Sequence, residues 1–155
     1  MKYSNIIFIV MIFLSFVFVT QDSLAFSDNF KDVNSIINNR DSAQTEYNNN
    51  LDLVPRFFKS MFGNERINLT ITMTDNSVKH FSIETRKGYV KTITEDVFDD
   101  YTIDISLTEL TANRIINSKD QIKSLKQALD THEITYKPHR FRTFVKVFVS
   151  KLFII

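Results

Sequence analysis

The sequence predicts a two-layer α+β domain in which an antiparallel-rich, five-stranded sheet is covered on one face by helices. Three observations lead to this fold class. Five segments alternate between apolar and polar residues, as half-buried strands do. Two stretches carry apolar residues at helical spacing, and short turn signals join the first three strands. The chain has 155 residues, 43% of them apolar, which suits one modest domain with a real core.

The composition excludes several classes of function. With no cysteine, the chain cannot form disulfides, use a catalytic thiol or bind a metal through thiolates. The net charge of +1 gives no argument for a nucleic-acid partner. The sequence also lacks a phosphate-binding loop, a nucleophile elbow, a zinc-protease helix and a dinucleotide fingerprint. We therefore expect no cofactor, no catalytic residues and no enzymatic activity.

Residues 1–25 have the layout of a secretory signal peptide. A basic residue stands near the start, an apolar run follows from Ile6 to Val19, and the small residues Ser23 and Ala25 mark a cleavage site. The run is shorter than the about 20 residues that a membrane-spanning helix needs. Two interpretations stay open, namely cleavage after Ala25 and an uncleaved N-terminal anchor. Both imply an exported, extracytoplasmic protein, with membrane association as a further option.

Residues 26–50 are interpreted as a polar linker with one short helix. Phe30, Val33, Ile36 and Ile37 have the spacing of a short amphipathic helix. The following segment, "RDSAQTEYNNN", shows no periodic apolar residues and is expected to be the linker itself. The α+β domain is therefore expected to span residues 51–138.

The domain is expected to open with a helix in "LDLVPRFFKSMFGNE". Asp52 is placed to cap its N-terminus, Pro55 suits its first turn, and Gly63 suits a left-handed C-terminal cap. Its apolar residues form one stripe, so the helix should pack on the sheet.

A three-strand meander is expected next. Alternation predicts strands in "RINLTITMT", "VKHFSIETR" and "YVKTIT". Asp75-Asn76 and Lys87-Gly88 are turn signals between them.

A fourth strand, two helices and a fifth strand complete the expected order. "YTIDIS" alternates again, and Ser106 and Glu109 have the spacing of a capping box, which predicts a helix from Leu107. Ser118 and Gln121 repeat that spacing at a second helix. "HEITYK" is then expected to be the last strand, ended by a proline.

The titratable clusters do not predict a metal or catalytic site. His80, His132 and His139 have no ligand spacing. The acidic loop "EDVFDD" lacks the spacing and the glycine of a calcium-binding loop. Its adjacent carboxylates, Asp99 and Asp100, would point apart on an extended chain, which disfavours a glycosidase pair. We therefore expect no metal site.

One glycosylation sequon occurs, at Asn68-Leu69-Thr70. It lies inside a predicted strand, on the face away from the aliphatic residues. We interpret it as a chance match.

The apolar residues of the sheet and helices have two interpretations. They form an ordinary core, or they line a cavity for an apolar ligand. The 15 phenylalanines and the methionines can line an adaptable cavity, because such side chains are bulky or flexible, but the same composition suits a filled core. The expected lining consists of Phe58, Met61, Phe62, Leu69, Ile71, Met73, Phe81, Ile83, Ile103, Ile105, Leu110, Ile122, Leu125, Phe144 and Phe148.

The order of these elements resembles that of the sterol carrier protein-like domain. The resemblance rests on "INLTITMTDNSVKHFSIETRKGYVKTI" and "DYTIDISLTELTANRIINSKDQIKSLKQALDTHEITYKP" and covers about residues 51–138. In these segments a strand meander precedes a strand that runs directly into a Ser/Thr-capped helix, followed by a short second helix and a last strand. The resemblance implies an α+β sheet with helices over one face, often with a hydrophobic tunnel for lipid or acyl chains. It implies no catalytic residues.

Residues 139–155 predict a basic amphipathic C-terminal helix. Phe141, Phe144, Phe148 and Leu152 fall in one stripe, but the last four residues are all apolar and extend beyond it. Three roles stay open for this helix. It covers the core, contacts an anionic membrane surface, or closes as a lid over a ligand.

Together these observations predict an exported, non-enzymatic binding module for a lipid or acyl chain held between the sheet and the helices. The alternative is a membrane-associated structural or interaction protein of the cell envelope with no small-molecule ligand. The expected partners are a lipid, and a membrane surface that the C-terminal helix contacts. Nucleic acid is not an expected partner.

Overall fold

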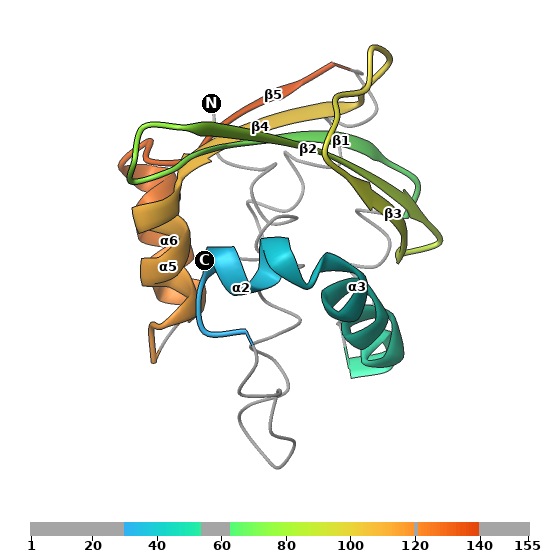
Figure 1. Cartoon of the computed structure of the whole chain (residues 1–155), viewed down its shortest axis with the longest axis horizontal. Helices are drawn as coiled ribbons and strands as arrows, with labels where there is room; N and C mark the ends of the chain where they lie inside the picture. The colour runs from blue at the N-terminus through green and yellow to red at the C-terminus, as the bar shows by residue number, and fades with distance from the viewer. Residues whose placement is uncertain (1–29, 54–62, 120, 140–155) are drawn as a thin grey trace.

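The computed structural model describes residues 30–53, 63–119 and 121–139 (Figure 1). A five-stranded sheet forms one layer, and the described helices lie on one side of it. The strands are β1 (Arg66–Thr72), β2 (Val78–Arg86), β3 (Tyr89–Thr94), β4 (Ile103–Thr108) and β5 (Thr135–Pro138). The helices are α2 (Val33–Asn38), α3 (Arg40–Asn49), the 3-10 turn η1 (Leu51–Leu53), α5 (Glu109–Ile116) and α6 (Gln121–Asp130).

The sheet has the order β3-β2-β1-β4-β5. β1 pairs antiparallel with β2 and parallel with β4, while β2–β3 and β4–β5 are antiparallel. The sheet is therefore mixed but mostly antiparallel, and the predicted α+β fold class is confirmed.

The turns of the meander explain its register. Asn76 has φ 66°, and the pair Lys87 and Gly88 has φ 54° and 86°. Two successive residues with positive φ are what a tight hairpin turn between right-twisted strands requires. The two predicted turns are confirmed, and the three strands lie within the predicted segments.

The expected linker is wrong over residues 40–49, because they form α3. Ala43 and Tyr47 are 0% and 1% exposed, so this helix is anchored in the core. The remaining residues of α3 are polar, and two of them, Gln44 and Asn48, donate side-chain hydrogen bonds to main-chain carbonyls of β3.

The helix after β4 begins two residues later than predicted. β4 continues to Thr108, which pairs with Thr72, so Leu107 belongs to the strand. Thr108 rather than Ser106 is the N-cap, and its side chain accepts a hydrogen bond from the Thr111 N–H. The predicted capping box is therefore wrong, since the strand pairing extends past its first residue.

Three expectations fall outside the described residues. These are the signal-like segment 1–25, the helix expected after residue 53 and the C-terminal helix. Within the part of the chain that the structure describes, no helix is long and apolar enough to cross a membrane.

Candidate functional site

The concave face of the sheet is a continuous apolar surface. The strand register places Phe81, Leu69 and Ile105 side by side across β2, β1 and β4. Ile83, Ile67 and Ile103 form the adjacent row. Side chains in such rows contact their cross-strand neighbours, so the face is apolar over the three central strands.

Helices contact this face toward its two lateral edges, near β3 at one end and near β4 at the other. α3 packs against β3, while α5 packs against β4 and α6, and α2 bridges from α5 to α3 (Figure 1). The apolar rows of β1 and β2 lie between these two helix contacts.

The structure brings together most of the predicted lining residues. One buried cluster contains Leu69, Ile71, Met73, Phe81, Ile83, Ile103, Ile105 and Leu125, each 8% exposed or less. Phe58, Met61, Phe62, Phe144 and Phe148 lie outside the described residues, as does the side chain of Ile122.

The predicted inward orientation of Leu110 is wrong. Leu110 is 70% exposed, whereas Ala112 and Ile115 on the same helix are buried. The later start of α5 explains the difference. Leu107 is a buried residue of β4, and α5 begins at Glu109, so that the second residue of the helix, Leu110, faces solvent.

Sequence reasoning missed the contribution of α3 to this core. Ala43, Tyr47 and Leu51 are buried at a spacing of four residues, which is one face of a helix. That spacing was the available signal, but polar residues dominate the segment. Burial raises the pKa of Tyr47 to about 12, and its hydroxyl donates to the Gly88 carbonyl at 2.9 Å.

A buried carboxylate joins α5 to the rest of the domain. Glu109, 6% exposed, accepts hydrogen bonds at Oε2 from the Thr74 N–H at 2.9 Å and hydroxyl at 2.8 Å. Its Oε1 accepts from the Asn34 amide at 2.6 Å. One turn further along α5, Asn113 accepts from the Val33 N–H at 2.8 Å, which satisfies a free donor at the start of α2. The side chains of Glu109 and Asn113 therefore have a structural role, connecting α5 to α2 and to the β1–β2 turn.

The acidic loop is a strap tied to the outer face of the sheet. The Asn68 side chain donates to the Phe98 carbonyl at 2.9 Å and accepts from the Phe98 N–H at 2.8 Å. The guanidinium of Arg66 lies 4.1 Å from the Phe98 ring centroid and pairs with Asp100. Because Asn68 is 7% exposed and uses both ends of its amide, its structural role accounts for its presence in the sequon.

A second polar cluster connects α5 to the turn after α6. The Glu133 carboxylate accepts hydrogen bonds from the Arg114 guanidinium at 2.7 Å, the Thr111 hydroxyl at 3.1 Å and the Thr131 hydroxyl at 2.9 Å. The hydrogen bond from Arg114 is the main reason why the pKa of Glu133 lies below its usual value. The cluster is a partly exposed ion pair, with its acceptors already occupied.

His80 and His139 each contact a neighbouring uncharged side chain. His80 bonds Thr70 at 3.2 Å, and His139 packs edge-on against Tyr101 with ring centroids 4.2 Å apart. Within residues 30–53, 63–119 and 121–139, no group of three His, Cys, Asp or Glu side chains is arranged to hold a metal ion.

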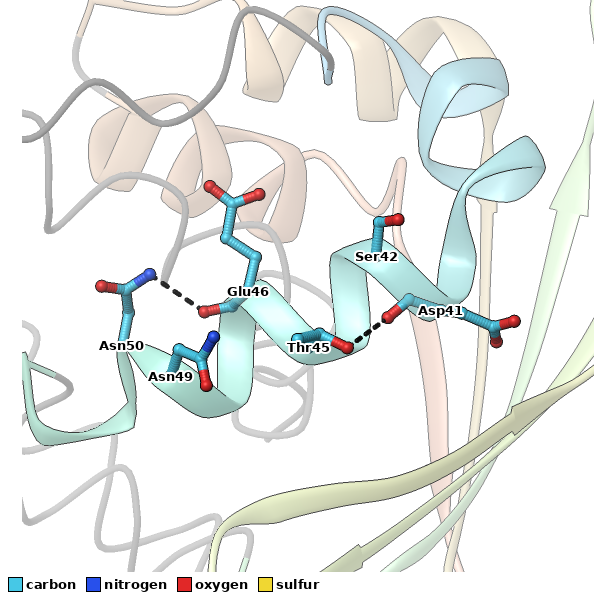
Figure 2. A pocket seen from close by; sticks show the side chains of 6 residues that line it. All are labelled: Asp41, Ser42, Thr45, Glu46, Asn49 and Asn50. Atoms are coloured by element: carbon cyan, nitrogen blue, oxygen red, sulfur yellow. Dashed lines mark hydrogen bonds between the residues drawn. The ribbon is translucent and has the colours of Figure 1, made fainter.

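A polar hollow of about 370 Å³ lies along α3 (Figure 2). Figure 2 shows that the carboxylates of Asp41 and Glu46 point in different directions, so they do not converge on one ligand. The side chains of Thr45 and Asn50 donate hydrogen bonds to main-chain carbonyls of α3, at 2.8 and 2.9 Å. The hollow is therefore an open polar surface rather than a built site. Its described lining is Asp41, Ser42, Thr45, Glu46, Asn49 and Asn50.

Comparison with known proteins leaves the family undetermined. No protein-family model matches the sequence, and no curated protein matches it. Among solved structures, a double mutant of the sec-alkylsulfatase Pisa1 aligns at 15% identity with a TM-score of 0.38, over 64% of this chain. The stereoselective inverting sec-alkylsulfatase Pisa1 from a Pseudomonas species aligns at 12% identity with a TM-score of 0.35, over 67% of this chain. The chain spans only 15% of the length of each, and similarity at this level carries no argument about activity.

Proposed function

We propose that this chain is an exported, non-enzymatic binding module for an apolar ligand, a lipid or acyl chain held between the sheet and the helices. The observation that carries the proposal is the apolar concave face, which continues across β2, β1 and β4 between two separate helix contacts. Apolar ligands bind to concave surfaces lined by such side chains.

The order of elements supports the same proposal. A strand meander, a fourth strand, two helices and a last strand follow one another as in the sterol carrier protein-like domain. We propose that the resemblance extends to the use of the apolar face, and that the ligand's hydrocarbon chain lies along the rows of Leu69 and Ile67. The signal-like residues 1–25 support export.

The first experiment asks whether the purified full chain carries a lipid. Native mass spectrometry and solvent extraction should find about one acyl chain or lipid per protein, and a fluorescent fatty acid should displace it. Because a ligand that binds only the folded state stabilises it, added fatty acid should also raise the unfolding temperature, by an amount that grows with the logarithm of its concentration once the site is saturated. Absence of extracted lipid, of displacement and of a thermal shift would overturn the proposal.

A pair of variants on neighbouring residues locates the site. Leu69 points to the concave face, whereas Thr70 points to the outer face and is hydrogen-bonded to His80. Leu69→Trp should weaken fatty-acid binding by about tenfold or more, since it fills the proposed path and costs about 1–3 kcal/mol of packing strain. Thr70→Trp should leave binding unchanged. Circular dichroism of both variants separates a blocked site from a failure to fold.

The same experiments distinguish the alternative function. A membrane-associated structural or interaction protein should sediment with anionic vesicles while showing no saturable binding of a single acyl chain. Equal binding by the Leu69→Trp and Thr70→Trp variants would likewise favour a ligand site outside the sheet face, or none.

A further inference from the structure

A lysine stands at the end of the apolar concave face. In the central strands β1, β2 and β4, Lys79 is the one charged residue that faces this side. The register pairs Lys79 with Ile71, which is 2% exposed, and Ile71 with Leu107 of β4. Directly paired residues point to the same side of a sheet, so the three side chains form one row. β3 ends opposite Ser82, so no strand continues the row beyond Lys79, and its side chain is exposed.

The concave side of β2 changes from exposed and charged to buried along the strand. Phe81 and Ile83 follow Lys79 on the same face, and they are 3% and 2% exposed. The far end of this face is closed, because Thr85 is 3% exposed and its hydroxyl accepts a hydrogen bond from the Glu65 N–H at 3.0 Å. A ligand that lies along β2 would therefore have its polar end beside Lys79 and its apolar part against the buried residues.

The carboxylates at the β1–β2 turn are bonded to donors other than Lys79. Asp75 accepts a hydrogen bond from the Ser77 N–H at 2.8 Å. Hydrogen bonding to Ser77 is the main reason why the pKa of Asp75 lies below its usual value, and the charge of Lys79 makes a smaller contribution. The buried Glu109 is bonded to Thr74 and to α2. Among the residues that the structure describes, no carboxylate forms an ion pair with Lys79, so its ammonium is open to an anionic ligand.

We propose that the ligand is an acyl chain with a free carboxylate, and that Lys79 binds this carboxylate while the hydrocarbon chain crosses the rows of Leu69 and Ile67. The inference rests on the proposed function and adds the head group and the orientation of the ligand. At neutral pH a carboxylate is ionised and a lysine is protonated, so their hydrogen bond is charge-assisted and stronger than a neutral one. The aliphatic stem of a lysine also packs on apolar surface while its ammonium stays in water, which suits the mouth of such a site.

The test compares hexadecanoic acid with hexadecanol, which has the same chain and no charge. Displacement of an uncharged fluorescent alkyl probe from the full chain measures both affinities. The unaltered protein should bind the acid about tenfold more tightly than the alcohol. Lys79→Met should weaken binding of the acid by about tenfold and leave that of the alcohol unchanged, whereas Lys79→Arg should keep the preference. Lys137→Met is the control, because Lys137 is exposed and pairs with Asp104 in a row of the outer face. It should leave both affinities unchanged.

The outcomes separate the head group from the proposed function. Equal binding of acid and alcohol by the unaltered chain would overturn the role of Lys79 and leave the proposed function in place. So would equal losses of acid binding in Lys79→Met and Lys137→Met, which would show an effect of net charge alone. A Lys79→Met variant that loses both ligands equally would also overturn the assignment. If neither compound binds the unaltered chain, the proposed function fails and this inference fails with it. If circular dichroism shows that Lys79→Met does not fold, Lys79→Gln is judged by the same criteria.

Discussion

At the scale of single residues, Glu109 joins three parts of the chain through one buried carboxylate. It collects hydrogen bonds from Thr74 in the β1–β2 turn and from Asn34 in α2 while being almost fully buried. A buried carboxylate is tolerated only when such partners replace its water. Three segments distant in sequence are therefore held at one side chain.

Substitution Glu109→Ala should lower the free energy of unfolding by about 1–3 kcal/mol, because it removes three hydrogen bonds that the buried carboxylate accepts from Thr74 and Asn34. The neighbouring variant Leu110→Ala is the matched control. With 70% of its surface exposed, Leu110 should change stability by no more than about 0.5 kcal/mol. Urea unfolding followed by circular dichroism measures both, and equal effects would contradict the assigned role of Glu109.

Tyr47 gives a prediction about pH. Burial raises its pKa from 10.0 to about 12, so between these values the unfolded chain loses the phenol proton while the folded chain keeps it. Stability must therefore fall as pH rises through this window, by up to about 1.4 kcal/mol per pH unit from this one group. Tyr47→Phe should remove that contribution, while costing about 1 kcal/mol at neutral pH for the lost bond to Gly88. Urea unfolding at pH 8, 10 and 11 measures the free energy of unfolding of both proteins. An identical dependence of that free energy on pH in the two proteins would refute the prediction.

At the scale of elements, the strands were predictable and one helix was not. Alternating residues such as Ile67, Leu69 and Ile71 report directly on a half-buried strand, and turn residues fix the hairpins. α3 was not predicted because polar residues such as Gln44 and Asn48, which are typical of linkers, make its hydrogen bonds to β3. Its Ala43 and Tyr47 form too narrow an apolar stripe to outweigh that composition.

The junction between β4 and α5 shows a different limit of sequence reasoning. Ser106 and Glu109 match a capping box, yet the strand pairs with β1 as far as Thr108. Local capping patterns cannot report how far a neighbouring strand will extend the sheet, since that depends on residues 36 positions away. The carboxylate expected to cap its own helix instead bonds Thr74 and Asn34. Likewise, Leu110 could be assigned to the core only by starting the helix too early.

The position of the cap can be tested directly. Thr108→Ala should destabilise the protein by about 1 kcal/mol, because it removes the acceptor for the Thr111 N–H at the first turn of α5. Ser106→Ala, two residues earlier, should cost no more than about 0.5 kcal/mol, since this side chain lies on the outer face of the sheet. Thermal unfolding of both variants distinguishes the two caps. A larger loss for Ser106→Ala would restore the capping box that the sequence suggested.

At the scale of the whole molecule, the two faces of the sheet have separate tasks. The concave face is apolar across its central strands, and the helices contact it near β3 at one end and near β4 at the other. The outer face is polar and carries the strap of residues 95–100, which Asn68 and Arg66 hold in place. An apolar ligand of the kind proposed would therefore enter between the sheet and the helices.

The N-terminal helices are part of this single core, which leads to the last prediction. Phe30, Val33, Tyr47 and Leu51 belong to the same buried cluster as the sheet residues, and Glu109 and Asn113 tie α2 to α5. A chain that begins at residue 51 should therefore lose cooperative unfolding, because it exposes the sides of β3 and α5 that α3 and α2 cover. Its urea transition should broaden, with a lower slope, as less surface becomes exposed on unfolding. The full chain with Asn49→Ala, altered within the same segment but only on its exposed side, should keep a sharp transition. A shortened chain that unfolds as sharply as the full one would mean that the sheet and α5–α6 form an independent unit.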